Sequence, residues 1–192
     1  AIARHPVGID RGWVPLRRRR VRPLGNTAQE PLVHQRLPRL ELADRMGFGG
    51  LALEMAARIH PDEASVVDSL AWLRYKQGRM LDTLEANPLR SRGAITLLRR
   101  AILLPNGAGN PDLHDHLGDA LFRTNDTTNA LLSWQTSLDL VTNDIARART
   151  LNVPPTFVSR LLESARLTRS KISAVAAGTP PKVAPLAADP VK

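Results

Sequence analysis

The segment spanning residues 111–140 constrains the fold of this chain more than any other stretch. Its first half repeats Leu113, Leu117 and Leu121 at helical spacing, after a Pro-Asp pair that suits a helix start. Residues 124–127 carry side chains that bond nearby backbone, and they predict a tight turn. Alanine, leucine and tryptophan residues then share one face of a second helix. Two short helices joined in this way form an αα-hairpin, which cannot bury its apolar face alone.

This hairpin resembles a tetratricopeptide repeat, the helix–turn–helix unit of α-solenoids. Asn125 stands where the family places a turn glycine, and asparagine tolerates the left-handed backbone angles that this position needs. The resemblance implies an all-α solenoid of stacked hairpins, similar to the C-terminal repeat region of a larger bacterial protein. It indicates a scaffold and not an activity. The matching residues are Leu117, Gly118, Ala130, Trp134 and Ser137, and Phe122 stands next to the family's usual aromatic position.

Two further segments match the same pattern, so the repeats are expected to span residues 35–153. Residues 62–104 resemble a second repeat, but its two helices are further apart in sequence than in the family. We therefore expect an insertion near residues 80–92 to loop out at the turn. Residues 35–61 resemble a degenerate hairpin that lacks the Leu-Gly pair.

The C-terminal part of the chain predicts one more helix and a tail. Residues 154–178 read as a long helix that Thr156 caps and Gly178 ends, and such a helix would seal the exposed end of a solenoid. Its basic side chains, Lys171 among them, are expected to stay outside the packed face. The proline-rich tail, residues 179–192, should be extended or disordered.

Composition narrows the class of protein. The absence of cysteine excludes disulfides and thiolate metal sites, and no apolar run is long enough for a membrane span. A chain of 192 residues that begins without methionine is expected to be a processed product or part of something longer. Bacterial cytoplasm and periplasm both stay open as its compartment.

The net charge of +9 is unevenly distributed along the chain. Residues 1–40 hold nine arginines against two acids, residues 41–144 hold ten basic and fourteen acidic side chains, and residues 145–192 hold eight basic and two acidic ones. The repeat region is therefore mildly acidic, and the basic residues lie in the two flanks.

The N-terminal flank, residues 1–34, is rich in arginine and proline and is expected to be extended. Its basic cluster predicts attachment to nucleic acid, an acidic partner or an anionic surface. A solvated linker is the alternative. The cluster consists of Arg17, Arg18, Arg19, Arg20 and Arg22.

No motif in the chain predicts catalysis. There is no Gly-rich phosphate loop, no nucleophile elbow and no paired metal-ligand motif. His114 and His116 are two residues apart on a predicted helix and point to different sides, so they cannot hold one metal ion together. We expect a non-enzymatic protein without a metal or cofactor.

The tetratricopeptide resemblance predicts a concave groove lined by one face of each first helix. The groove would offer four carboxylates and three aromatic rings, which suit an extended, basic and partly apolar segment. That segment could belong to a protein partner in a larger complex, to an upstream part of the polypeptide, or to residues 11–22 of this chain. Alternatively, the carboxylates have no binding role and only keep this helix face exposed to solvent. The predicted groove residues are Asp68, Trp72, Tyr75, Lys76, Asp112, Asp115, Asp119, Phe122 and Arg123.

These observations predict a protein–protein adaptor or assembly scaffold. The alternative is attachment to nucleic acid or an anionic surface through the arginine cluster. Salt dependence separates the two, because counterion release makes nucleic-acid binding collapse steeply with salt, whereas apolar contacts persist.

Overall fold

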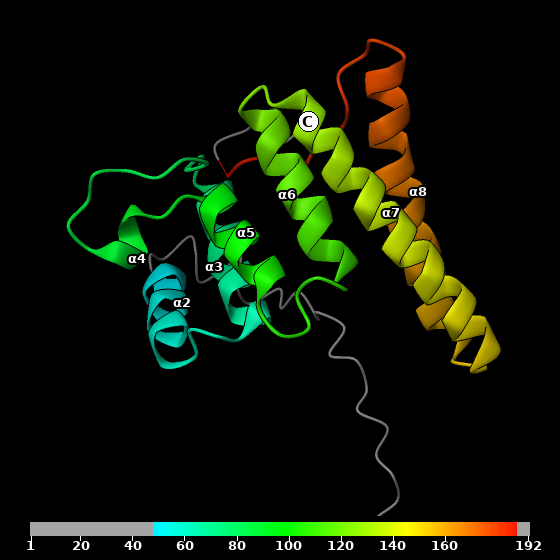
Figure 1. Cartoon of the computed structure of the whole chain (residues 1–192), viewed down its shortest axis with the longest axis horizontal. Helices are drawn as coiled ribbons and strands as arrows, with labels where there is room; N and C mark the ends of the chain where they lie inside the picture. The colour runs from blue at the N-terminus through cyan, green and yellow to red at the C-terminus, as the bar shows by residue number, and fades with distance from the viewer. Residues whose placement is uncertain (1–47, 188–192) are drawn as a thin grey trace, which may run out of the picture. The chain divides into compact units, whose positions relative to one another are not determined.

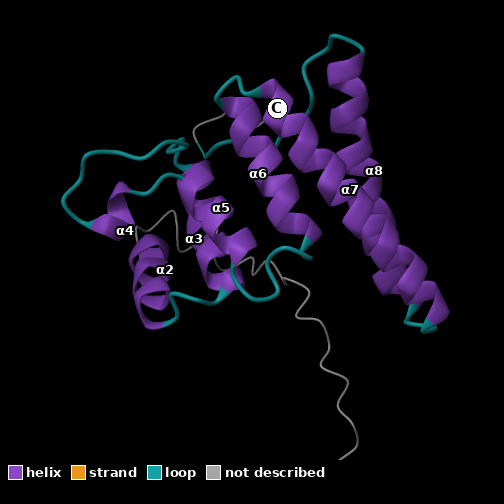
Figure 2. Cartoon of the chain, viewed as in Figure 1, coloured by secondary structure: helices purple, strands orange, loops and turns teal. Residues whose placement is uncertain are grey.

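The computed structural model describes residues 48–187, and their regular structure is entirely helical (Figures 1 and 2). The all-α prediction is therefore confirmed for this part of the chain. The helices are α2 (Phe48–Ile59), α3 (Ala64–Lys76), α4 (Pro88–Ser91), α5 (Ala94–Leu103), α6 (Pro111–Arg123), α7 (Thr127–Thr150) and α8 (Pro155–Ala176).

The long helices pack in chain order. Helix α2 lies against α3, α3 against α5, α5 against α6, α6 against α7, and α7 against α8 (Figure 1). Helices α3 and α6, the first helices of the two predicted repeats, also contact each other. Each amphipathic helix buries its apolar stripe mainly against its neighbours in this order.

The hairpin of α6 and α7 is built around Trp134, which is completely buried. Gly118 lies directly under the indole ring: a Cβ atom at this position would stand 2.4 Å from two of its ring atoms. Asn110 caps α6 and Asp126 caps α7, each by accepting a backbone N–H bond. Asn125 has φ 63°, which confirms the left-handed turn residue that the sequence predicts.

The insertion between α3 and α5 is an ordered loop that contains the short helix α4. Its two ends lie close together, because the carbonyls of Arg79 and Met80 accept hydrogen bonds from the Ala94 and Ile95 amides. These bonds satisfy two of the amides that the start of a helix leaves without partners. Gly93 fits here because the carbonyls of residues 80 and 81 approach within 2.5 Å of where a Cβ would be.

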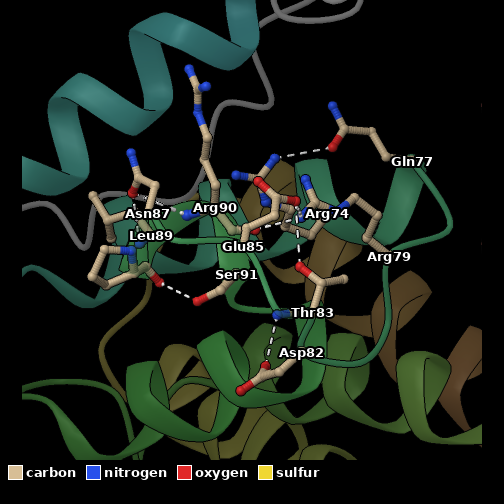
Figure 3. A network of polar contacts seen from close by, with 12 residues as sticks. Arg74, Gln77, Arg79, Asp82, Thr83, Glu85, Asn87, Leu89, Arg90 and Ser91 are labelled. Atoms are coloured by element: carbon tan, nitrogen blue, oxygen red, sulfur yellow. Dashed lines mark hydrogen bonds and ion pairs between the residues drawn. The ribbon is translucent and has the colours of Figure 1, made fainter.

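A polar network fixes the rest of the insertion (Figure 3). Arg79 bonds the Glu85 carboxylate at 2.6 Å and also the Arg90 carbonyl. Asn87 caps α4, and the Thr83 amide bonds the Ser91 carbonyl at 2.7 Å. The loop is thus held by its own residues.

A buried ion pair connects this loop to the helices. Arg74 of α3 bonds Glu54 of α2 at 2.8 Å, and Arg90 bonds the other oxygen of Glu54 at 3.0 Å. Burial raises the pKa of Glu54, but the hydrogen bonds and charges of the two arginines outweigh it and hold that pKa below its usual value. The carboxylate therefore stays ionised at neutral pH.

Helix α8 packs against α7 over a small apolar cluster of its own, formed by Val141, Ile145 and Ala165. The prediction that Thr156 caps this helix is wrong. The helix begins at Pro155, with Pro154 at the cap position and no side-chain cap bond. Proline is favourable in the first helical turn because its missing N–H would have no partner there.

Several predictions lie outside the described residues. These are the arginine-rich segment of residues 1–34, including residues 11–22 as an occupant of the groove, the first part of the 35–61 hairpin, and the tail beyond residue 187. Within residues 48–187, no helix is both long enough and apolar enough to cross a membrane.

Gly118→Ala tests the packing under Trp134. We expect a loss of about 1–2 kcal/mol of stability, because the cost of overpacking exceeds the gain in helix propensity. Gly50→Ala is the matched control. Its Cβ would lie 3.5 Å from Leu73, an ordinary contact, so stability should be unchanged or slightly higher. Urea unfolding followed by circular dichroism measures both, and equal stabilities for the two variants would contradict the assignment.

Candidate partner-binding face

The predicted groove residues lie on two helices that contact each other, α3 and α6. We call this surface the α3–α6 face, and two direct bonds join its halves. The ring nitrogen Nδ1 of His116 lies 2.9 Å from Asp68, and Arg123 Nε donates to the Tyr75 hydroxyl at 3.3 Å. The face consists of Asp68, Trp72, Tyr75 and Lys76 from α3, and of Asp112, Asp115, Asp119, Phe122 and Arg123 from α6.

An aromatic stack runs along this face. The Trp72 ring lies between two others, with its centroid 4.7 Å from that of Tyr75 and 3.9 Å from that of His116. The ammonium group of Lys76 lies 5.7 Å from the Trp72 centroid, within the range of a cation–π contact. The Trp72 and Tyr75 rings are parallel within 2°, the His116 ring is tilted by 25° to Trp72, and Tyr75 is completely buried.

His116 is charged more readily here than in water. Burial lowers its pKa, but the charge and hydrogen bond of Asp68 raise it, and Asp115 and Asp112 add to the effect. The net pKa lies above the usual value. His116 and Asp68 thus form an ion pair over a wider pH range than an isolated histidine would allow.

Asp119 is the most fully bonded carboxylate of the face, and it is buried. One of its oxygens accepts from Trp134 Nε1 at 3.1 Å and from Lys171 Nζ at 2.6 Å, and the other accepts from the Ala184 amide at 3.0 Å. Burial raises the pKa of Asp119 and so does Asp115, whereas Lys171 and the Ala184 amide oppose them; the net pKa is above its usual value. Each of the three donors stabilises the buried carboxylate.

The prediction that Lys171 stays outside is wrong. Its side chain is 8% exposed, and its ammonium group bridges Asp115 at 2.7 Å and Asp119 at 2.6 Å. Thr168, one turn earlier on α8, also bonds Asp115 at 3.0 Å. Helix α8 therefore supplies one ammonium group and one hydroxyl to two of the four predicted carboxylates, and His116 bonds a third.

The tail after α8 returns to this face (red in Figure 1) and meets it mainly through its backbone. The Ala184 carbonyl accepts from the Tyr75 hydroxyl at 2.5 Å and from Arg123 Nη2 at 2.9 Å, and the Pro185 carbonyl accepts from Lys76 Nζ at 2.7 Å. The Ala187 amide donates to the Lys76 carbonyl at 2.9 Å. The α3–α6 face thus holds a non-helical stretch of the chain's own polypeptide.

Apolar tail side chains complete this contact. Val183, Ala184 and Leu186 pack against the main core, and Pro181 is buried. Phe122, also predicted for the groove, instead faces inward, with its ring 5.9 Å from that of Trp134. The sequence pattern placed the helix faces together but did not reveal the tail, Lys171 or the contact between His116 and Trp72. One feature of the sequence could have indicated the ion pairs: Lys171 lies beside the apolar stripe of α8, and α6 carries an aspartate pair.

The described residues contain no group of three or more histidine, aspartate or glutamate side chains that could hold a metal ion. Comparison of the chain with protein families, curated proteins and solved structures found no match. The tetratricopeptide resemblance accordingly rests on the residues quoted above.

Asp68→Asn tests the pairing with His116. A raised histidine pKa means that protonation stabilises the fold, fully below the unfolded value of about 6.5, and that this contribution is lost as the pH rises through the folded pKa. The variant should lower the His116 pKa and remove this pH-dependent stability. Histidine NMR titration measures the shift. Asp62→Asn is the control, because that carboxylate is 82% exposed; a pKa that stays the same in Asp68→Asn would contradict the pairing.

Lys171→Met tests the buried ion pairs. Removing the ammonium leaves two carboxylates facing each other without a counter-charge, so we expect a loss of about 3 kcal/mol or more in urea unfolding. Arg166→Met, on an exposed turn of the same helix, should leave stability unchanged. Similar midpoints for the two variants would show that Lys171 does not hold this face together.

Proposed function

We propose that the chain is a non-enzymatic protein–protein adaptor, built as a solenoid of tetratricopeptide-like hairpins with α8 as its sealing helix. Its α3–α6 face binds an extended segment of a partner protein. The consecutive packing of helices supports the solenoid, because each hairpin covers the apolar face of the one before it.

One observation carries the proposal: this face already holds a non-helical segment, the chain's own residues 181–187. Tyr75, Lys76 and Arg123 donate to backbone carbonyls of that segment, and Asp119 accepts from a backbone amide. Main-chain bonds of this kind supply affinity for any extended peptide, and the apolar contacts beside them supply selectivity.

The second candidate is attachment to nucleic acid or an anionic surface through Arg17, Arg18, Arg19, Arg20 and Arg22. The observation behind it is the concentration of basic residues at the N-terminal end, next to an acidic repeat region.

Affinity capture from a source-cell lysate separates the two candidates. The baits are the wild-type chain, a Lys76→Met/Arg123→Met variant that removes two donors to the bound backbone, and a variant in which the five clustered arginines become glutamine. Each is used with and without nuclease at moderate salt, and captured proteins are identified by mass spectrometry.

The adaptor proposal predicts a discrete protein set that survives nuclease and salt, persists in the glutamine variant and disappears in the Lys76/Arg123 variant. Capture that vanishes with nuclease and in the glutamine variant would favour nucleic-acid attachment instead. Retention of the same proteins by the Lys76/Arg123 variant would refute a role of the α3–α6 face.

A further inference from the structure

We infer that residues 181–187 are a built-in ligand of the α3–α6 face, and that a partner must displace them by presenting a segment of the same chemistry. That segment is non-helical, contains proline, and carries small or branched apolar side chains at the positions that meet the face. This inference rests on the proposed function and adds to it the class of partner segment and the competitor that controls its access.

The tail is connected to α8 in the manner of a tethered peptide. Helix α8 ends with backbone bonds from Gly178 to the Val175 carbonyl and from Thr179 to the Ala174 carbonyl, and Gly178 has φ 69°. Residues 176–180 are all exposed. An exposed hinge thus separates the helix from the docked strand, and the strand can leave without unwinding α8.

The docked strand makes contacts that resemble those of a bound ligand. Lys182, Pro185 and Ala187 are exposed, and the bonds to Tyr75, Lys76 and Arg123 all go to backbone carbonyls. The Ala184 amide in turn donates to a side chain of the face, the Asp119 carboxylate. A different chain with the same backbone path could make each of these bonds.

The apolar contacts define what that other chain must look like. Pro181 is buried, and Val183, Ala184 and Leu186 meet the core. Prolines stiffen an extended segment and lower the entropy cost of docking it. At this end of the face Asp115 and Asp119 already share Lys171, and the tail side chains that meet the core are uncharged, so recognition of the segment does not require a charge on it.

The tether sets how strongly the tail competes. A short linker holds a ligand at an effective concentration of the order of millimolar, so a free peptide of equal intrinsic affinity is excluded until it approaches that level. Weakening the tail alone should therefore expose the site to a peptide added in solution.

The experiment measures binding of a fluorescent synthetic peptide of residues 179–192 by anisotropy to three full-length chains. Ala184→Pro removes the amide that bonds Asp119, Lys182→Ala changes an exposed tail side chain as the matched control, and wild type is the reference. Ala184→Pro should bind the peptide about tenfold more tightly or better than wild type, because losing a hydrogen bond to a charged group shifts an equilibrium by that order. Lys182→Ala should bind it like wild type.

Adding Lys76→Met/Arg123→Met to Ala184→Pro should abolish the gain, which locates binding on the α3–α6 face. A gain that survives these two changes, or no gain in an Ala184→Pro chain with wild-type helical circular dichroism, would overturn the inference. A peptide of the same composition in scrambled order controls for non-specific binding.

Hydrogen exchange on the wild-type chain tests the same inference if Ala184→Pro fails to fold. The Ala184 and Ala187 amides should exchange through local opening, faster than the slowest amides of α3 and α6, and faster still when unlabelled peptide is added. Exchange of both amides only with global unfolding would make the tail an integral part of the fold and refute the inference.

The two proposals can fail separately. Peptide binding that follows the expected pattern while lysate capture stays empty would keep the built-in ligand and reject the adaptor. Capture from lysate could instead depend on Lys76 and Arg123 and yet be equal for wild type and Ala184→Pro. That result would support the adaptor function and refute competition by the tail.

Discussion

The buried carboxylate of Asp119 is the interaction on which the described structure depends. It lies on α6 and accepts hydrogen bonds from Trp134 on α7, from Lys171 on α8 and from the Ala184 amide in the tail. An ionised group removed from water is tolerated only when its partners are in place, so the four segments are ordered together. The cluster favours one arrangement of α8 and the tail over alternatives that apolar packing alone would permit.

Three aspartates of the face have bonding partners in the structure, which the sequence alone did not indicate. As a sequence, four aspartates on two helix faces suggest an open acidic surface. In the structure, Asp115 and Asp119 share Lys171, and Asp68 pairs with His116. A lysine from the basic C-terminal part of the chain thus forms ion pairs with two aspartates of α6. The face also carries hydrogen-bond donors that bond the backbone of the tail, with the aromatic stack beside them.

A tail docked in this way serves two purposes at once. It covers apolar surface on α3 and α6 that would otherwise be wet, and it leaves an exposed hinge at Gly178. Tighter docking of the tail therefore stabilises the fold and at the same time covers more of the α3–α6 face. The ordered insertion between α3 and α5 has no such conflict, because its bonds are to its own residues and to the Glu54–Arg74 pair.

The sequence by itself determined the local structure. Helical periodicity, proline and glycine placement and capping residues act within a few positions, so they located the hairpin of α6 and α7, its left-handed Asn125 and the insertion before α5. The resemblance to the tetratricopeptide repeat, and not these local signals, grouped the residues of the α3–α6 face. Only the tertiary structure decided what covers that face, because the contacts of Lys171 and Ala184 with Asp119 join residues more than fifty positions apart. No periodic signal spans such a distance, and an extended strand without a repeating pattern carries none of its own.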